Sequence, residues 1–297
     1  MGEVRATIWR LIAAHMRADA AIPWHGADLD FTGITITTDV DFSGTVFSDG
    51  TVRFEDVKFA GGSVQFSDAK FSGGGVSFKE AKFTGGKLFF DNAWFSGGTV
   101  SFSGTKITEG MILFNRAKFS GGIIWFDRAE FSGGAVGFDA AEFSGGWTSF
   151  DASEFSNSVV RFPRAKFTGG QVRFFLSHFS GGMLVFASSE FSDGLVSFEK
   201  AKFSDGLVSF DEAKFSGGKV EFDEAKFTGG KVDFTRVADW SYPPTGLPDQ
   251  ANRLQQPLRL ASSSAGKSPE EVAGPAAVIH PSAEPEFDVT RASPEDC

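Results

Sequence analysis

The sequence predicts an all-β chain wound into a parallel β-helix, with a short helix before it and an irregular tail after it. Three observations predict this fold class. The chain of 297 residues contains 36 Phe and 36 Gly, so its large apolar side chains are nearly all of one type. From 47 to 238 it divides into 16 consecutive twelve-residue units, without insertion or deletion. Within each unit apolar residues alternate with polar ones, as in a strand with one buried face.

The first segment, 1–26, is predicted to form an amphipathic capping helix. One helical face carries the apolar residues Val4, Ile8, Leu11 and Ile12, and the arginines Arg5, Arg10 and Arg17 lie away from it. Because a solenoid exposes strand edges at both ends, a helix packed over the first coil is the simplest explanation. A helix that binds a partner or a membrane surface is the alternative.

Residues 27–238 form the predicted solenoid, which is regular from 47 onward. The unit that begins at Phe71 has the sequence Phe-Ser-Gly-Gly-Gly-Val-Ser-Phe-Lys-Glu-Ala-Lys. Position one is Phe in 15 units, position eight is Phe in all 16, and position four is Gly in 15. No helical repeat tolerates Gly at nearly every equivalent position. Each unit is therefore predicted to form two short strands separated by a glycine turn.

This repeat resembles that of the pentapeptide-repeat family. The segment Ala27-Asp28-Leu29-Asp30-Phe31 is close to the family pattern, and Ala81-Lys82-Phe83 and Ala213-Lys214-Phe215 fit its Phe-centred variant. The resemblance covers residues 27–238 and implies a right-handed quadrilateral β-helix of the kind found in related bacterial chains. The sequence departs from the family in one respect, since its central apolar residues are spaced alternately five and seven residues apart.

Each coil holds either one unit or two. Twelve residues at ~3.3 Å each give a perimeter of roughly 40 Å, and a slab ~4.8 Å thick within it is overfilled by two Phe, one Val and one Ala. Two units give about 24 residues per coil and leave the needed room. We therefore expect the units to pair into coils with four inward Phe each, so that identical residues stack in ladders.

The last segment, 239–297, is predicted to be a capping segment followed by a disordered tail. Nine of the eleven prolines lie within 243–297, together with many Ser, Ala and Glu residues. Such a composition buries too little apolar surface to fold. Trp240 and Tyr242 come directly after the repeat, where they could cover the last coil.

Charge, cysteine content and hydropathy restrict the class of protein. A formal net charge of −10 disfavours direct nucleic acid binding. Cys297 has no partner for a disulfide, and a single cysteine suits a reducing compartment. The N-terminal segment lacks the continuous apolar run of a signal peptide, and no stretch is long enough for a membrane span. We expect a soluble cytoplasmic protein.

No residue pattern indicates catalysis. The four His residues stand in unrelated contexts without metal-ligand spacing. Acidic and basic residues recur together, as on a solvated charged surface. We therefore predict a protein that is not an enzyme, with no catalytic, cofactor-binding or metal-binding residues, no cofactor and no small-molecule substrate.

The outward positions of the units become apolar in the middle of the repeat. A contiguous exposed apolar surface on a solenoid favours a protein contact. The alternative is that the N-terminal helix or the tail covers these residues. The candidate partner-binding residues are Met111, Leu113, Ile123, Trp125, Trp147, Val159, Phe175, Met183, Val185, Leu195 and Leu207.

These observations favour a non-catalytic binding scaffold that contacts another protein or a second copy of itself in a homodimer. The resemblance implies a second hypothesis, because some pentapeptide-repeat proteins mimic duplex DNA and bind topoisomerase. A mimic needs a continuous negative face, and here lysines at position twelve interrupt a partial acidic column formed by Asp127, Asp139, Asp151, Asp211 and Asp223. A purely structural solenoid, or a truncated relative without independent function, is the third hypothesis.

Overall fold

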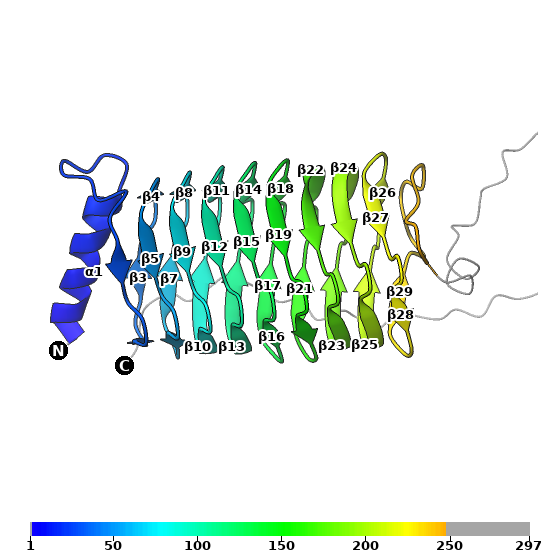
Figure 1. The fold of residues 1–297 in the computed structure, drawn as a ribbon, viewed down its shortest axis with the longest axis horizontal. Coiled ribbons are helices and arrows are strands. Elements are labelled where there is room, and N and C mark those ends of the chain that lie inside the picture. Colours follow the sequence, from blue (N-terminus) through cyan, green and yellow to red (C-terminus); the bar gives the residue numbers. More distant parts are fainter. Residues whose placement is uncertain (1, 248–297) are drawn as a thin grey trace, which may run out of the picture. The chain divides into compact units, whose positions relative to one another are not determined.

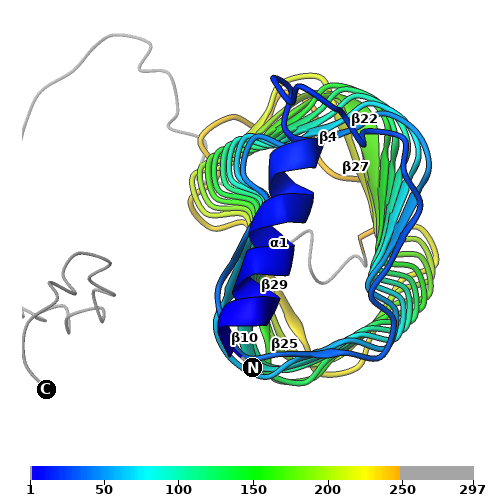
Figure 2. The ribbon, with the colours of Figure 1, turned by 90° about the vertical axis from the view of Figure 1, so that its left-hand side faces the viewer.

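Parallel strands wind into a solenoid of about nine turns, shown in Figure 1. The structure, a computed structural model, describes residues 2–247. The predicted disordered tail lies, from 248 onward, outside the described residues. Figure 2 shows that each turn is a flattened ring with a sheet on each long side. The predicted parallel β-helix is confirmed.

Two sheets make up the solenoid, and each takes one twelve-residue unit from every coil. The first sheet, of 15 strands, contains β1 (Leu29–Asp30), β4 (Val46–Phe47), β5 (Thr51–Arg53), β8 (Lys70–Phe71), β9 (Gly75–Ser77), β11 (Trp94–Phe95), β12 (Thr99–Ser101), β14 (Lys118–Phe119), β15 (Ile123–Trp125), β18 (Glu142–Phe143), β19 (Trp147–Ser149), β22 (Lys166–Arg173), β24 (Glu190–Ser197), β26 (Lys214–Phe215) and β27 (Lys219–Glu221). The second sheet, of 14 strands, contains β2 (Thr35–Ile36), β3 (Val40–Asp41), β6 (Lys58–Phe59), β7 (Ser63–Gln65), β10 (Lys82–Phe89), β13 (Lys106–Leu113), β16 (Glu130–Phe131), β17 (Ala135–Gly137), β20 (Glu154–Phe155), β21 (Val159–Arg161), β23 (His178–Val185), β25 (Lys202–Ser209), β28 (Lys226–Phe227) and β29 (Lys231–Asp233).

The strand register decides the length of a coil. Phe59 lies beside Phe83, and Val76 beside Val100, so paired residues are 24 apart in the sequence. The 24-residue coil is thus confirmed and the twelve-residue coil is excluded. The first coil differs by one residue, since Leu29 pairs with Val52. This offset corresponds to the irregular sequence that precedes the regular repeat.

Ladders of phenylalanine rings fill the interior. Phe114 lies 4.7 Å from Phe90 and 4.8 Å from Phe138, with ring planes 5° and 4° from parallel. The position-eight rings of the two units in a coil meet edge to face, as Phe78 and Phe90 do at 6.3 Å between ring centroids and 89° between ring planes. Stacked and edge-to-face pairs are both favoured aromatic geometries. Ile107 replaces Phe in one ladder and is fully buried.

A tight turn follows the position-eight Phe of each unit and leads the chain from one sheet to the other. In every unit except the last, the residue at position ten has a positive φ, from 52° at Ala140 to 58° at Asp68 among the non-glycine residues. Such values are uncommon outside glycine. The turn is closed by a backbone hydrogen bond, as from Ala81 N to Phe78 O at 3.1 Å. The sequence indicated positive φ only at the glycine pairs, so this second set of turns is a finding of the structure.

Side-chain hydroxyls add bonds between successive coils. Thr108 Oγ1 donates to the Phe83 carbonyl at 3.1 Å, and Ser153 Oγ donates to the Phe126 carbonyl at 2.6 Å. The first hydroxyl stands beside the glycine turn and the second replaces the buried small residue of the other turn. Each such bond joins residues about one coil apart and contributes on the order of 1 kcal/mol to stability.

The helix α1 (Gly2–Met16) lies across the open end of the first coil, as Figures 1 and 2 show. Trp9 packs on Phe31 at 4.8 Å and on Phe42 at 5.9 Å between ring centroids. The helix therefore covers the strand edges and the first rings of the ladders with apolar surface.

The face of α1 that contacts the coil contains Ile12 but not the other three residues predicted for it. The buried residues are Ile12, Ala13 and Met16, which lie with Trp9 on one side. The predicted contact residues Val4, Ile8 and Leu11 are 65%, 50% and 54% exposed. Trp9 offers the largest apolar area of the helix, and its burial against two Phe rings sets the rotation of the helix about its axis.

At the other end, residues 239–245 cover the last coil. The Trp240 ring meets Phe215 at 5.5 Å and Phe234 at 5.3 Å, both edge to face. Asp239 and Thr245 form isolated parallel bridges to Lys214 and Glu221. Tyr242 is 58% exposed, so its side chain does not take part in the cover, although its backbone N–H donates to the Phe215 carbonyl at 2.9 Å.

Replacement of one ladder ring tests the contribution of stacking. We expect Phe138→Ala to lower the free energy of unfolding by about 3–5 kcal/mol, because the ring is fully buried and its neighbours are held by their own coils. Urea denaturation followed by circular dichroism measures this loss. The control Lys118→Ala, on the exposed side of β14, should change stability by less than about 0.5 kcal/mol. A loss below about 1 kcal/mol for Phe138→Ala would contradict the ladder as the main source of stability.

Two glycines of one turn provide a matched test of backbone approach. A Cβ at Gly73 would lie 2.2 Å from the Ser48 carbonyl oxygen of the preceding coil, whereas a Cβ at Gly75 would meet its nearest atom, in Thr51, at 3.9 Å. We expect Gly73→Ala to destabilise the protein by about 1–3 kcal/mol, since the coils must separate. Gly75→Ala should be neutral or stabilising by up to about 1 kcal/mol. Thermal unfolding of the two variants side by side decides, and equal effects would contradict this account.

Candidate functional site

The predicted outward columns follow the strand register. On the second sheet, Met111, Ala135, Val159, Met183 and Leu207 lie side by side on successive coils. On the first sheet, the corresponding column is Ile123, Trp147, Gln171 and Leu195. Figure 2 shows the two sheets on opposite sides of the ring. The structure therefore divides the candidate residues between two separate surfaces.

The column on the second sheet forms an apolar stripe, defined by Met111, Ala135, Val159, Met183 and Leu207. Val159 and Met183 are 37% and 44% exposed, and the other three are half-buried. The stripe has charged limits, because Lys87 precedes Met111 and Lys231 follows Leu207 in the same column. With coils ~4.8 Å apart, the stripe is about 19 Å long.

A second outward column lies two residues further along each strand and includes Leu113, Gly137 and Val185. It contributes less apolar surface than the sequence predicted. Val185 is half-buried beside the stripe, but Leu113 is only 9% exposed. The next residue in this column is Gly137, whose missing side chain leaves space that Leu113 fills. A Cβ at Gly137 would lie 3.0 Å from Leu113 Cδ2. Leu113 is therefore part of the packed surface and not an exposed contact residue.

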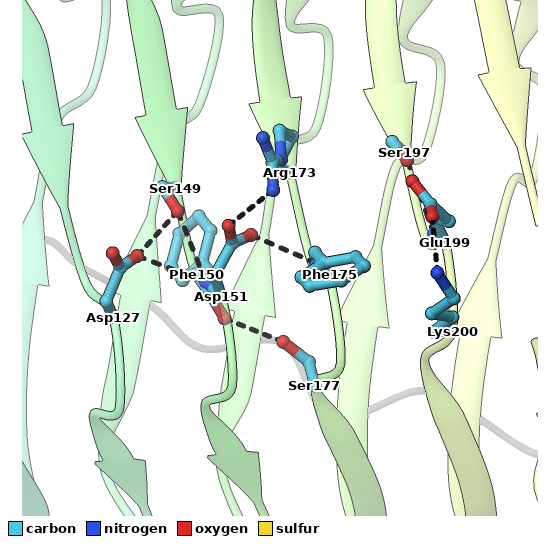
Figure 3. A network of polar contacts seen from close by, with 10 residues as sticks. All are labelled: Asp127, Ser149, Phe150, Asp151, Arg173, Phe175, Ser177, Ser197, Glu199 and Lys200. Atoms are coloured by element: carbon cyan, nitrogen blue, oxygen red, sulfur yellow. Dashed lines mark hydrogen bonds and ion pairs between the residues drawn. The ribbon is translucent and has the colours of Figure 1, made fainter.

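On the first sheet, an arginine organises the aromatic candidates. The Arg173 guanidinium lies 4.9 Å from the centre of the Trp147 ring and 5.5 Å from that of Phe175. Its Nη2 atom forms an ion pair with Asp151 Oδ2 at 2.7 Å, as Figure 3 shows. We call Trp147, Asp151, Arg173 and Phe175 the Arg173 cluster. Cation–π contacts of this kind strengthen as water is excluded.

The acidic residues in and beside the cluster are fixed by further hydrogen bonds. Asp151 Oδ1 accepts a bond from the Phe175 amide at 3.0 Å, and Asp127 Oδ1 accepts one from Ser149 Oγ at 2.5 Å. Burial raises the pKa of the Asp151 carboxyl above its ordinary value, although the nearby Arg173 charge and the Phe175 amide oppose this rise. The charged groups of the cluster therefore bond mainly to one another, whereas the buried Trp147 Nε1 has no hydrogen-bond partner among the described residues.

The remaining candidates on the first sheet flank this cluster. Trp125 is half-buried and lies 5.9 Å from Trp147, with ring planes at 40°. Ile123 and Leu195 are half-buried in the outward column. Sequence reasoning identified the aromatic residues, but it did not name Arg173, and it placed Asp151 in an acidic column and not beside these rings. The signal was available, since a basic and an acidic residue stand 22 positions apart, which is nearly one coil.

Comparison with models of known protein families finds no match to the chain, and comparison with curated proteins finds none either. The architecture is established. The regular Phe spacing and the parallel solenoid are consistent with a pentapeptide-repeat-like fold.

The acidic column considered in the sequence is divided and neutralised. Asp127, Asp151 and Asp223 lie in the turns that leave the first sheet, whereas Asp139 and Asp211 lie in the turns that leave the second. Arginines pair with three of them: Arg173 with Asp151, Arg164 with Asp139, and Arg236 with Asp211. The column does not present a continuous negative surface.

Two further features of the described residues concern metal binding and membrane insertion. Within residues 2–247, no group of three or more His, Cys, Asp or Glu side chains is arranged to hold a metal ion. In the same part of the chain, no helix has the length and apolar character needed to cross a membrane.

The raised pKa of Asp151 predicts an unusual pH dependence. At pH values between the pKa of Asp151 in the unfolded chain and its higher pKa in the folded protein, this carboxyl is protonated in more of the folded molecules than of the unfolded ones. The free energy of unfolding therefore falls as pH rises through that interval. We expect the free energy of unfolding of the wild type, minus that of Asp151→Asn, to decrease from about pH 3 to about pH 6. Urea denaturation across this range measures it.

Asp239→Asn serves as the opposite control. Hydrogen bonds from Ser241 lower the pKa of Asp239, so its contribution to stability is lost as pH falls through the folded pKa. The wild type minus Asp239→Asn difference should therefore increase with pH over the same range. Slopes of the same sign for Asp151 and Asp239 would contradict the assignment.

Proposed function

We propose that this protein is a non-catalytic scaffold of the pentapeptide-repeat type that binds another protein through the apolar stripe, with a second copy of the chain as the first partner. The proposal places this activity in the cytoplasm, because a single cysteine suits a reducing compartment. The observation that carries it is the stripe itself, five apolar residues in register on five successive coils.

The position of the stripe argues against a role in folding. The equivalent positions at both ends of the repeat are polar, such as Ser63 and Lys231, so the coil does not require an apolar residue there. Apolar residues at outward positions therefore add little to the core and leave apolar surface in water. Exposed apolar surface that is contiguous and bordered by charge is typical of protein contacts.

The symmetry of the stripe favours self-association. A twofold interface places the same patch of both subunits against each other, so the patch must be complementary to itself. Val159 is the midpoint of the stripe, with two apolar residues on each side. Two copies packed in opposite directions would set Met111 against Leu207 and Ala135 against Met183, and Val159 would lie on the axis.

A charge placed in the stripe tests the proposal. We expect the wild-type chain to sediment as a dimer at micromolar concentration and Met183→Lys to raise the dimer dissociation constant at least ~10-fold, because a lysine would be buried without a partner. Analytical ultracentrifugation over a dilution series measures both.

Leu176→Lys is the matched control. Leu176 is 54% exposed and lies in a turn that leaves the first sheet, away from the stripe, so its substitution should leave the dimer unchanged. A wild-type chain that is monomeric throughout the series would contradict self-association, and a dimer that Met183→Lys does not weaken would contradict the stripe as its interface.

A further inference from the structure

A second surface lies on the first sheet, over β5, β9, β12 and β15. These strands are neighbours on four successive coils, as Figure 1 shows. The surface is hollowed into an open groove of about 630 Å³. Because coils are ~4.8 Å apart, the groove extends over about 14 Å along the solenoid.

The floor of the groove is polar and built from small side chains. Ser77 and Ser101 are nearly buried at 8% and 5% exposure, and Thr51 and Thr99 are half-buried beside them. Ser77 Oγ donates a hydrogen bond to Glu55 Oε1 at 2.7 Å. Ser101 Oγ likewise donates to Ser103 Oγ at 3.2 Å, so these two serines offer a ligand acceptor lone pairs, while the hydroxyls of Thr51 and Thr99 can also donate.

An aromatic platform closes one end of the groove. Trp125 lines the groove and lies 5.9 Å from Trp147. Trp147 in turn is held by the Arg173 guanidinium, which is bonded to Asp151. The Arg173 cluster therefore holds the Trp125 ring in position before a ligand binds.

The charges around the groove balance. Three basic residues, Arg53, Lys79 and Arg128, stand with three acidic residues, Glu55, Glu80 and Asp127. Within the part of the chain that the structure describes, none of the three basic side chains forms an ion pair with an acid. The groove can therefore donate and accept hydrogen bonds at many points without favouring a ligand of either charge.

These features exclude two classes of extended ligand. A nucleic acid requires an excess of basic residues, which neither the groove nor a chain of net charge −10 supplies. A peptide that binds as an added strand requires a free sheet edge. The central strands β9 and β12 are paired on both sides and offer none.

We propose that this groove binds a neutral oligosaccharide of three to four sugar units along the axis of the solenoid. A sugar ring has a flat apolar face that packs on an indole, and hydroxyls around its rim that bond to carboxylate, guanidinium and hydroxyl groups. The coil rise of ~4.8 Å is close to the length of one sugar ring, so each sugar unit would face the side chains of one coil, such as Ser77 on one and Ser101 on the next.

Tryptophan fluorescence of the full chain tests the proposal. A glycan array first shows which neutral saccharide binds best. The fluorescence titrations then use cellotetraose, xylotetraose and chitotetraose as probes. We expect saturable binding that shifts the emission, and Trp125→Ala should raise the dissociation constant at least ~10-fold. Thr99→Trp, which fills the groove and leaves the platform in place, should weaken binding similarly.

Trp94→Ala is the matched control, since Trp94 is 48% exposed on β11 and does not line the groove. It should leave the dissociation constant unchanged. Absence of binding to every neutral saccharide on the array would overturn the proposal. Tighter binding of tetragalacturonate, a DNA oligonucleotide or a peptide would also overturn it, as would saccharide binding that neither groove variant weakens.

Discussion

Face-to-face stacking of phenylalanine rings between successive coils is the interaction on which the rest of the structure depends. A ladder requires each ring to lie above its equivalent one coil earlier, as Phe114 does above Phe90 at 4.7 Å. This requirement restricts the coil to a whole number of units, and the volume of the inward side chains selects two. An insertion of one residue would turn inward side chains outward, which explains why the repeat runs from 47 to 238 without one.

Ring stacking requires a small spacing between coils. This spacing also restricts which residues can stand in the turns, outside the core. At Gly73, Gly97 and Gly121 a Cβ would lie 2.2–2.4 Å from a carbonyl oxygen of the preceding coil, so no side chain fits at these positions. The other turn reaches its corner with a positive φ at residues such as Leu176, at a conformational cost of about 1–2 kcal/mol each. The core and the interstrand hydrogen bonds outweigh this cost in every coil.

Because the ladders alone specify the coil, the outward columns are free to differ along the axis. One side of the ring presents the apolar stripe centred on Val159, and the other presents the Arg173 cluster and the groove that ends at Trp125. The two surfaces have different chemistry and share no residue. A solenoid of this kind can engage two different ligands without rearrangement of its core.

The sequence by itself determined the architecture, since a twelve-residue period with recurring inward Phe permits few folds and the volume of those side chains selects two units per coil. It also determined the columns Met111 to Leu207 and Ile123 to Leu195, because register follows directly from the repeat. Tertiary structure decided the rest. Trp9 rather than Val4 or Ile8 faces the first coil, because a helix rotates to bury its largest side chain. Leu113 is buried because Gly137 leaves space beside it. Arg173 reaches Asp151 and Trp147 because the coil brings together residues that are 22 or more positions apart in the sequence.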